Sequence, residues 1–455
     1  MTLQQIINKQ RALVNQGDTT NFNWRQYQLK QLHKLVQENE AEFIAALAQD
    51  LSKSEYETWV TEIAYVLGEI KHTLKHLRSW MKPNRVFTPL AAQPGRSYTI
   101  AEPLGSILII GAWNYPIQLM FAPLTSALAA GNTAVLKPSE LAPNVSRLIA
   151  RLVRSYFSED IVTVIEGGVA ETTELLACEF DHIMYTGSGN VAKIVMQAAA
   201  KYLTPVTLEL GGKSPVYFDQ SALNSVCIER LVWGKWLNAG QTCVAPDYVL
   251  ATQETASQLI PLLQKQINAM YGNDPKQSDS YGRIVNNRHL TRLNHYLDGQ
   301  NVVIGGECDN EQNYLAPTVV LAPDIDSPIM QDELFGPILP IVIVADINAA
   351  MALVKSRAKP LAAYIFSKNT AQQKQWQQKV SAGSMAINDT FMFTTVADLP
   401  FGGVGASGMG CHSGKHGFDN FSHTKSVIKR PLLKDLPIRF APFNKLKLKL
   451  VKMVR

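Results

Sequence analysis

A cysteine in a polar, glycine-containing stretch is the residue of this 455-residue chain best suited to covalent chemistry. Cys243 follows Asn-Ala-Gly-Gln-Thr and precedes Val-Ala-Pro-Asp-Tyr. A thiolate both attacks a carbonyl carbon and leaves from it well, as a covalent catalyst must. A single cysteine is more often a small buried hydrophobic residue. Because these polar, turn-like neighbours do not suit a core strand, we interpret Cys243 as a candidate nucleophile.

A carboxylate between two leucines precedes this cysteine by 34 residues, in the stretch Leu-Glu-Leu-Gly-Gly-Lys-Ser-Pro that begins at Leu208. Glu209 is a candidate base, because a carboxylate can take a proton from water. The two stretches resemble the signatures of the aldehyde dehydrogenase superfamily. The residues after Cys243 resemble its short, typically dimeric class-three branch, whose members act on fatty or aromatic aldehydes. The resemblance runs from about Leu29 to about Ile428.

Strands and helices alternate from Tyr98 onward, which predicts parallel sheets with helices on both faces and an α/β fold class. Helical spacing of apolar residues also predicts helices over 24–80. We expect strands at 106–110, 133–136, 161–165, 182–185, 206–210, 215–218 and 248–252, and helices at 117–130, 144–157, 171–178 and 190–203. The resemblance implies an aldehyde-dehydrogenase-like fold with two doubly wound parallel-sheet domains and a small β arm for oligomerisation.

The resemblance also implies how the chain is divided. Residues 1–82 and 101–210 would form a dinucleotide-binding domain and residues 211–395 a catalytic domain, while 83–100 and 396–430 would bridge subunits and 431–455 would form a basic tail. A homodimer is expected. In it, the arm near 98–102 and the segment 418–428 would meet across subunits.

Asn114 directly follows the strand expected at 106–110, at the sheet edge where ligands of open α/β folds collect. Its amide could donate to a developing oxyanion or merely cap the next helix, and the residues alone leave both roles open. In the family, this asparagine and the backbone N–H of the nucleophile form the oxyanion hole. The resemblance thus implies that Cys243 attacks an aldehyde, that a hydride leaves to a nicotinamide, and that water activated by Glu209 hydrolyses the thioester to a carboxylic acid.

Charged and glycine-containing turns after other strands are candidates for binding a dinucleotide. Lys137 and Glu140 lie outside a strand tip and could bind a ribose diol, although charged turns are usually only solvated. Residues 185–193 join a strand to a helix whose N-terminal amides attract a pyrophosphate, although Ala192 stands where many relatives have glycine. The resemblance implies NAD as the cofactor, with NADP also accepted, since a glutamate near the ribose disfavours a 2′-phosphate. The residues expected to bind it are Ile110, Trp113, Lys137, Ser139, Glu140, Gly187, Ser188, Val191, Leu210, Glu333 and Phe335.

Aromatic residues near these motifs predict an apolar substrate tunnel. They are Tyr115, Trp233, Phe393 and Phe401. Phe393 stands where many relatives carry histidine, which makes the entrance more apolar, and the glycine-rich loop 399–408 shapes the tunnel wall in the family. Such a tunnel suits medium or long aliphatic aldehydes, or aromatic ones.

Three other functions remain as alternatives. A CoA-acylating aldehyde dehydrogenase would pass the acyl group to a thiol, but such enzymes typically lack the base that Glu209 provides. A catalytically silent dinucleotide-binding protein would have no use for the intact set of Asn114, Glu209 and Cys243. A thiol hydrolase would use Cys243 without needing a dinucleotide.

The composition excludes several classes of protein. The five cysteines are scattered and lack metal-ligand spacing, which predicts reduced thiols, no metal site and a cytoplasmic location. Nine of the basic residues and one acid fall in 429–455, so the net charge of +5 comes from the tail and no nucleic-acid surface is indicated. No signal peptide and no membrane-spanning run is found.

The last twelve residues, 444–455, alternate cations with aliphatic side chains. This alternation favours an extended or unsettled segment over a helix. Such a tail is either simply solvated or makes weak peripheral contact with an anionic membrane.

Overall fold

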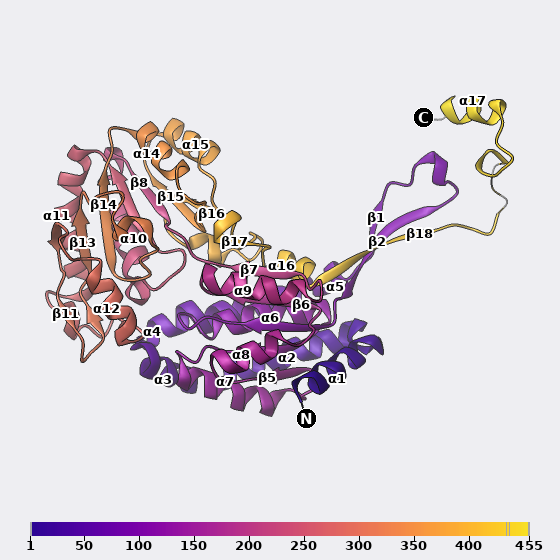
Figure 1. The fold of residues 1–455 in the computed structure, drawn as a ribbon, viewed down its shortest axis with the longest axis horizontal. Coiled ribbons are helices and arrows are strands. Elements are labelled where there is room, and N and C mark those ends of the chain that lie inside the picture. Colours follow the sequence, from indigo (N-terminus) through magenta and orange to yellow (C-terminus); the bar gives the residue numbers. More distant parts are fainter. Residues whose placement is uncertain (1, 434, 436, 454–455) are drawn as a thin grey trace.

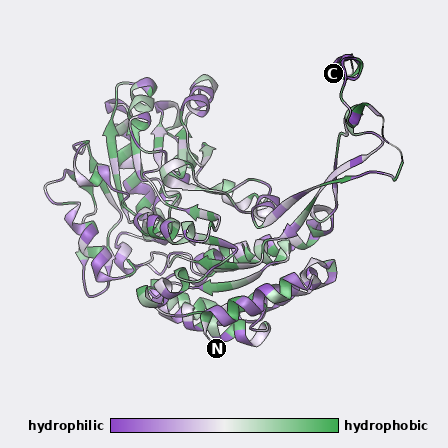
Figure 2. Ribbon diagram, turned by 45° about the vertical axis from the view of Figure 1, so that its right-hand side comes forward, coloured by the Kyte–Doolittle hydropathy of each residue, from purple (hydrophilic) through white to green (hydrophobic). Residues whose placement is uncertain are grey.

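The computed structural model describes residues 2–433, 435 and 437–453. Two units, each built on its own mainly parallel sheet, lie against each other, and a narrow arm projects away from both (Figure 1). Hydrophobic residues concentrate on the strands and on the helix faces turned toward them (Figure 2). The predicted α/β class is confirmed.

The first sheet has six strands in the order β17-β7-β6-β3-β4-β5. Every pairing is parallel except that of β17 with β7. The strands from β3 to β6 are buried at every position, as parallel strands covered on both faces must be. The strands are β3 (Ser106–Ile110), β4 (Thr133–Lys137), β5 (Val162–Val164), β6 (His182–Thr186), β7 (Val206–Glu209) and β17 (Gly408–Met409).

Helices before and between these strands cover the first sheet. They are α1 (Leu3–Asn15), α2 (Phe22–Glu38), α3 (Glu40–Leu51), α4 (Glu55–Thr58), α5 (Ala64–Trp80), α6 (Gln118–Ala130), α7 (Pro143–Tyr156), α8 (Val169–Leu176) and α9 (Gly189–Ala200). A π-helical turn, Trp59–Ile63, joins α4 to α5. Such widened turns often occur near functional sites, and this one carries Glu62 toward the junction of the two units.

The second sheet has seven strands in the order β10-β13-β14-β9-β8-β15-β16, and only β10 runs antiparallel to its neighbour. The strands are β8 (Pro215–Phe218), β9 (Tyr248–Ala251), β10 (Val302–Ile304), β13 (Thr318–Leu321), β14 (Ile338–Ile343), β15 (Ala362–Phe366) and β16 (Ser384–Ile387), beside a ribbon of β11 (Cys308–Asp309) and β12 (Tyr314–Leu315). The helices are α10 (Ser225–Trp236), α11 (Gln253–Tyr271), α12 (Asn287–His295), α13 (Pro328–Gln331), α14 (Ile347–Lys355) and α15 (Thr370–Lys379).

The arm is an antiparallel sheet of β1 (Asn84–Val86), β2 (Arg96–Pro103) and β18 (Ser422–Lys429), in the order β1-β2-β18. The expectation that residues 98–102 and 418–428 meet across subunits is wrong, because β2 and β18 pair within one chain, with Tyr98 opposite Val427. Phe418 is a buried residue of the helix α16 (Gly414–Asn420). Within the described residues, the outer edge of β18 has no strand partner.

The C-terminal segment contains a helix, α17 (Lys445–Met453), so the expectation of an extended segment is also wrong. Leucine, lysine and methionine are good helix formers, and the Asn444 side chain accepts a hydrogen bond from the Lys447 N–H at 2.9 Å. Val454 and Arg455 lie outside the described residues. Across the described part of the chain, no helix is long and apolar enough to cross a membrane.

Candidate active site

The loop between α10 and β9 carries Cys243 and has an unusual backbone. Asn238, Ala239 and Gly240 follow one another with left-handed φ angles of 52°, 51° and 74°. Asn238 and Ala239 are each 1% exposed. A side chain at position 240 would place its Cβ 2.3 Å from the Gly336 carbonyl oxygen, so glycine is required there. Because non-glycine residues rarely adopt this region, the surrounding contacts must hold the loop.

Side-chain amides provide those contacts. Asn238 Nδ2 donates to the Asn114 carbonyl at 2.9 Å and to the Gln241 carbonyl at 3.3 Å. Gln241 Nε2 donates to the Asn238 and Arg283 carbonyls at 3.0 and 2.9 Å, and Gln241 Oε1 accepts from the Val285 N–H at 3.0 Å. These bonds fix the backbone two residues before Cys243.

Asn114 lies at the carboxyl end of the first sheet and reaches this same loop. Its Nδ2 donates to the Gln241 carbonyl at 3.0 Å, which leaves one N–H of the amide without a partner among the described residues. The neighbouring Tyr115 hydroxyl lies 2.8 Å from Thr242 Oγ1. The structure therefore brings Asn114 and Cys243 together from different sheets, with an amide N–H available for a ligand.

A buried ion pair supports Asn114 from behind. Lys53 Nζ donates to Glu62 Oε1 at 2.6 Å and to the Asn114 carbonyl at 2.9 Å, and both charged side chains are 0% exposed. Glu62 Oε2 accepts from the Ile117 N–H at 2.8 Å. Burial also raises the pKa of the nearby Glu57 carboxyl to about 7, against the opposing charge of Lys53. Lys53 and Glu62 belong to no recognised motif, so sequence reasoning missed them.

Replacing Lys53 by methionine is expected to destabilise the fold by about 3–5 kcal/mol, because the Glu62 carboxylate would stay buried without its cation. The double variant Lys53→Met/Glu62→Gln should lose less. Lys415→Met removes an exposed pair with Asp419 and should cost about 1 kcal/mol or less. Urea unfolding of the four proteins checks this, and equal losses for Lys53→Met and Lys415→Met would contradict it.

Two carboxylates lie close enough to Cys243 to affect its titration. Burial raises the pKa of the Cys243 thiol, and the charges of Glu209 and Glu333 raise it further, against backbone N–H groups of Cys243 and Val244. The thiol lies deep in the molecule yet keeps part of its surface accessible. Glu209 ends β7 and is 3% exposed. The structure thus gathers the predicted nucleophile, base and oxyanion donor at one loop.

The carboxyl ends of β3, β4 and β6 carry residues expected to bind the dinucleotide. Ile110 and Lys137 are register partners on β3 and β4. Lys137 Nζ is buried, donates to the Pro138 carbonyl at 2.8 Å and lies 3.4 Å from Glu140 Oε2. The Glu140 side chain is exposed, and Ser139 is partly exposed beside it. A buried ammonium beside an accessible carboxylate fits the diol of a ribose.

The N-terminus of α9 lies at the surface, where its backbone N–H groups are accessible to an anion. Ser188 caps it through its side chain, 3.5 Å from the Val191 N–H, and Val191 offers exposed apolar surface beside it. Glycine is needed at position 187, since a Cβ there would lie 2.3 Å from Tyr185 Oη. Helix N-terminal amides attract phosphate groups, so this end of α9 fits a pyrophosphate.

Glu333 and Phe335 come from the second unit. A Cβ at Gly211 would lie 2.0 Å from Glu333 Oε2, so the adjoining backbone of Leu210 and Gly211 approaches this carboxylate closely. Burial raises the pKa of Glu333 to about 8, and Asp247 adds to the effect. The Phe335 and Trp113 rings meet edge to face at 5.4 Å. Groups suited to both ends of a dinucleotide are therefore present across the junction of the two units.

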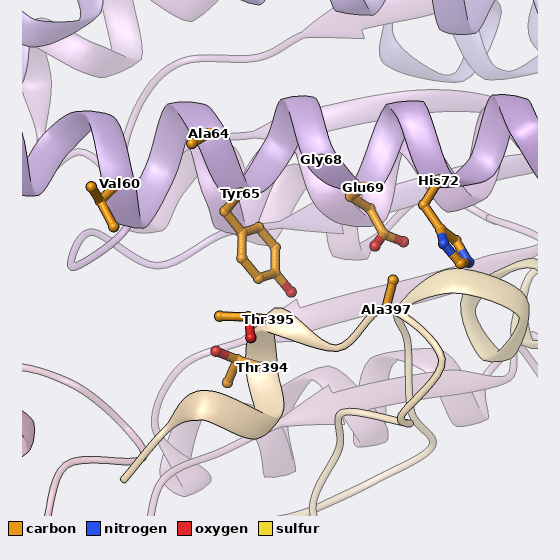
Figure 3. A pocket seen from close by; sticks show the side chains of 9 residues that line it. All are labelled: Val60, Ala64, Tyr65, Gly68, Glu69, His72, Thr394, Thr395 and Ala397. Carbon is orange, nitrogen blue, oxygen red and sulfur yellow. The ribbon is translucent and has the colours of Figure 1, made fainter. Parts of the chain in front are cut away.

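A pocket of about 470 Å³ opens beside α5 (Figure 3). Figure 3 shows Tyr65, Glu69 and His72 projecting from one side of the helix toward the segment that carries Thr394 and Thr395. The Glu209 charge contributes to a raised pKa of Tyr65, after burial and Glu69, which places the pocket near Glu209. The residues around it are Val60, Ala64, Tyr65, Gly68, Glu69, His72, Thr394, Thr395 and Ala397.

The four aromatic residues predicted for a substrate tunnel lie close to this region but are not among those that line the pocket. Phe393 stacks on Phe401 at 6.4 Å, Trp233 packs on Phe391 at 5.0 Å, and Tyr115 is buried. Sequence reasoning missed Tyr65 and Glu69. Their recurrence with His72 at i, i+4 and i+7 was the available signal, because this spacing puts three polar groups on one helix face.

The described residues hold no group of three or more His, Cys, Asp or Glu placed to bind a metal ion, and the five cysteines are free thiols.

Comparisons with known proteins agree with this geometry. The model of the aldehyde dehydrogenase family matches residues 2–427. The chain is 43% identical to the dimeric NADP-preferring aldehyde dehydrogenase of Canis lupus familiaris, over 97% of this chain and 98% of that protein. It is 45% identical to 4,4'-diaponeurosporen-aldehyde dehydrogenase of Staphylococcus aureus, over 97% of both chains.

A solved structure of Staphylococcus aureus AldH in a substrate-bound state superposes with a TM-score of 0.97, at 44% identity, over 100% of this chain and 99% of that one. A Mycobacterium tuberculosis aldehyde dehydrogenase complexed with NAD+ matches with a TM-score of 0.83 at 25% identity, over 94% of this chain and 90% of that one. The chain therefore belongs to the aldehyde dehydrogenase family, and it is an enzyme that oxidises aldehydes with NAD or NADP.

Proposed function

We propose that this enzyme converts medium or long aliphatic aldehydes, or aromatic ones, to carboxylic acids through a thioester on Cys243. The observation that carries the proposal is the convergence of Asn114, Glu209 and Cys243 at one loop. Reduction of NAD or NADP should be followed by absorbance across a homologous series of aldehydes. No reduction with any member would refute the proposal, and acyl-CoA formed on adding CoA would favour the CoA-acylating alternative.

The first step is attack by Cys243 on the aldehyde carbon. Because the pKa of this thiol is raised, its proton must leave as the carbon–sulfur bond forms. Glu209, whose charge reaches the thiol, is the proposed acceptor of this proton. The buried setting that raises the pKa of the thiol also strengthens the charge interactions in the site.

Negative charge then develops on the aldehyde oxygen. The free N–H of the Asn114 amide and the backbone N–H of Cys243 would donate to it. Preorganised donors of this kind each contribute on the order of 10²–10³ in rate. The hydrogen bonds from Asn238 and Lys53 to the Asn114 carbonyl hold the donor still before the charge appears.

A bound nicotinamide would supply the hydride acceptor, and loss of hydride would leave the carbon attached to Cys243 at the oxidation level of a thioester. Glu209 would take a proton from a water that attacks this carbon, and Cys243 would leave as a thiolate. Glu209 ends β7 on the first sheet, whereas Cys243 belongs to the second unit. The proposed base and the nucleophile would therefore approach the reacting carbon from different units.

The cofactor would be held by groups of both units. Lys137 and Glu140 would bind the adenine ribose, the amides at Ser188–Val191 the pyrophosphate, and Glu333 the nicotinamide ribose. The charge of Glu140 supports a preference for NAD, whereas the related canine enzyme is named NADP-preferring. Comparing kcat/KM for the two cofactors decides between them.

The aromatic side chains and the pocket beside α5 support an apolar aldehyde. Phe393, Phe401 and Trp233 are partly exposed near the loop of Cys243, and the pocket wall at Tyr65 adds a further ring. A similar Staphylococcus aureus enzyme is named for 4,4'-diaponeurosporen-aldehyde. We propose that the aldehyde enters along this surface, with its carbonyl carbon directed to Cys243.

We also propose the division of the chain into a dinucleotide-binding domain (1–82 and 101–210), a catalytic domain (211–395), bridging segments (83–100 and 396–430) and a basic tail. The two separate sheets and the projecting arm support it. A cytoplasmic location is part of the same proposal, and the five free cysteines support it.

A homodimer is expected at micromolar concentration. The arm projects from the rest of the chain, and the open edge of β18 offers a row of backbone groups to a partner (Figure 1). The related canine enzyme is named as dimeric. Light scattering checks the expectation. A monomer would contradict it, whereas a dimer that persists after the arm residues 84–99 are replaced by a short glycine-serine linker would exclude only the arm as its interface.

Removal of the tail after Pro431 is expected to leave activity on a water-soluble aldehyde unchanged. The described part of the tail carries exposed lysines and leucines, and α17 lies beyond the arm, away from both sheets (Figure 1). We propose weak attachment to an anionic membrane, at about 1 kcal/mol for each basic residue near the surface, and a merely solvated tail is the simpler alternative. Co-sedimentation with phosphatidylserine liposomes at low salt should fall on truncation. Equal co-sedimentation would leave only the solvated tail.

A further inference from the structure

Glu209 has a cationic neighbour that no motif includes. His412 Nε2 lies 2.7 Å from Glu209 Oε1, and the two side chains are 4% and 3% exposed. Neither atom has a well-aligned hydrogen bond to another described residue. The contact is thus a close ion pair. Within the described residues, Glu209 Oε1 has no other polar partner.

The groups around His412 favour its protonated form. Burial alone would lower the pKa of His412, but the carboxylates of Glu209 on β7 and Glu69 on α5 outweigh it, so that the pKa is raised. The other titratable neighbours of this cluster are Tyr65 and His72 on α5, Cys411 beside His412, and Cys243. Tyr65 and the two cysteines are neutral or negative in every state, and His72 acts on Glu69 and lies beside Asp398, so His412 is the histidine that contacts Glu209.

The backbone around His412 is held firmly in place. Its N–H and carbonyl form a two-bond bridge with Phe401, at 2.8 and 2.9 Å, and the two rings meet edge to face at 5.7 Å. Glu69 holds the next two residues of the chain: its carboxylate accepts a hydrogen bond from the Gly414 N–H at 2.6 Å and lies 3.5 Å from the Ser413 hydroxyl. The imidazole is therefore fixed in front of Glu209.

We propose that His412 is a positioning residue for the hydrolytic step: its imidazolium holds the Glu209 carboxylate in one orientation and keeps it ionised. This inference rests on the proposed role of Glu209 as the base. A carboxylate that is buried without a cation retains its proton, and a protonated carboxyl group cannot take a proton from water. His412 would thereby extend hydrolysis to lower pH.

Two variants separate the charge of His412 from the polar contact that its Nε2 makes with Glu209. His412→Gln keeps an N–H donor near the place of Nε2 but carries no charge, whereas His412→Ala loses both. Acyl-enzyme hydrolysis should be followed in single turnovers by rapid-quench release of the carboxylic acid, as a function of pH. The matched control is His295→Asn, which removes an exposed histidine 2.8 Å from Asp298 on the surface of the second unit.

For His412→Gln, the acidic limb of the hydrolysis rate should move up by about one pH unit or more, with a plateau close to wild type at high pH. For His412→Ala, the plateau should also fall about tenfold or more, because the carboxylate is no longer oriented. The first-turnover burst of reduced cofactor should persist in both variants. His295→Asn should match the wild type throughout.

An unchanged acidic limb in both His412 variants, with an intact burst, would overturn the role of His412. Failure of Glu209→Gln to accumulate a covalent acyl-enzyme on Cys243, checked by mass spectrometry of quenched single turnovers, would instead count against the thioester mechanism on which the inference rests. If His412→Ala fails to fold, as thermal unfolding would show, the shift of the limb in His412→Gln decides alone.

Discussion

Replacing Cys243 by alanine is expected to abolish aldehyde oxidation, with a fall in kcat on the order of 10⁴-fold or more. The thiol is the group proposed to form the covalent bond, and the loop 237–247 contains no second cysteine. Binding of NAD should remain nearly intact, because the groups proposed to hold its adenine half, Lys137 and Glu140, lie on the other sheet. Steady-state rates and calorimetric titration with NAD measure the two effects.

Cys178→Ala is the matched control, since Cys178 is also a free, partly accessible thiol but lies on the outer side of the first unit, after α8. It should keep full activity. A wild-type kcat in Cys243→Ala would remove the covalent mechanism altogether. A loss of NAD binding equal to the loss of activity would show instead that the substitution disturbs the strained loop at Asn238 and Ala239.

Short contiguous motifs are what made much of the site predictable. Glu209 and Cys243 each stand inside a stretch whose neighbours dictate a sharp backbone, and Asn114 and Lys137 follow strands that periodicity alone locates. In a parallel sheet, the residues after successive strands must emerge at one edge. The sequence order of strands and motifs therefore implied that these groups meet, before any distance was known.

The supporting residues escaped prediction because their partners are remote in the chain. Lys53 meets the Asn114 carbonyl, and His412 meets Glu209, only after two sheets have formed. Glu62 stands on the buried side of a helix, where a charged residue is expensive unless it is paired. A charged residue at a buried helical position thus indicates that a pairing partner exists, but it does not indicate which residue that partner is.

The arm and the tail were predicted least well, for a different physical reason. Strand pairing is set by long-range contacts, so residues 98–102 could find 418–428 in the same chain or in a second one, and the sequence does not distinguish the two. In the tail, the alternation of cations and aliphatic residues favoured a strand. Among the described residues, however, this segment pairs with no sheet, and without pairing a strand gains no stability. Local helix propensity then decides.

Glu209→Gln is expected to retain a first-turnover burst of reduced cofactor and then to stall, with steady-state turnover lower by about 10²–10⁴-fold. The amide is nearly isosteric with the carboxylate but cannot take a proton from water. Oxidation of the aldehyde needs Cys243 and Asn114, whereas hydrolysis of the thioester needs a base. Stopped-flow absorbance separates the two phases, and the size of the burst should equal the concentration of active sites.

The rate of that burst carries a second result. The charges of Glu209 and Glu333 both raise the pKa of Cys243, and Glu209 is the proposed acceptor of the thiol proton. A burst in Glu209→Gln as fast as in the wild type would assign that proton to another acceptor, and a slower burst of full size would assign it to Glu209.

Glu333→Gln is the matched control: it should slow the burst, because Glu333 is proposed to hold the nicotinamide ribose, and leave hydrolysis of the thioester unchanged. Normal steady-state turnover in Glu209→Gln would exclude Glu209 as the base, and His412 would then hold a carboxylate with no part in the chemistry.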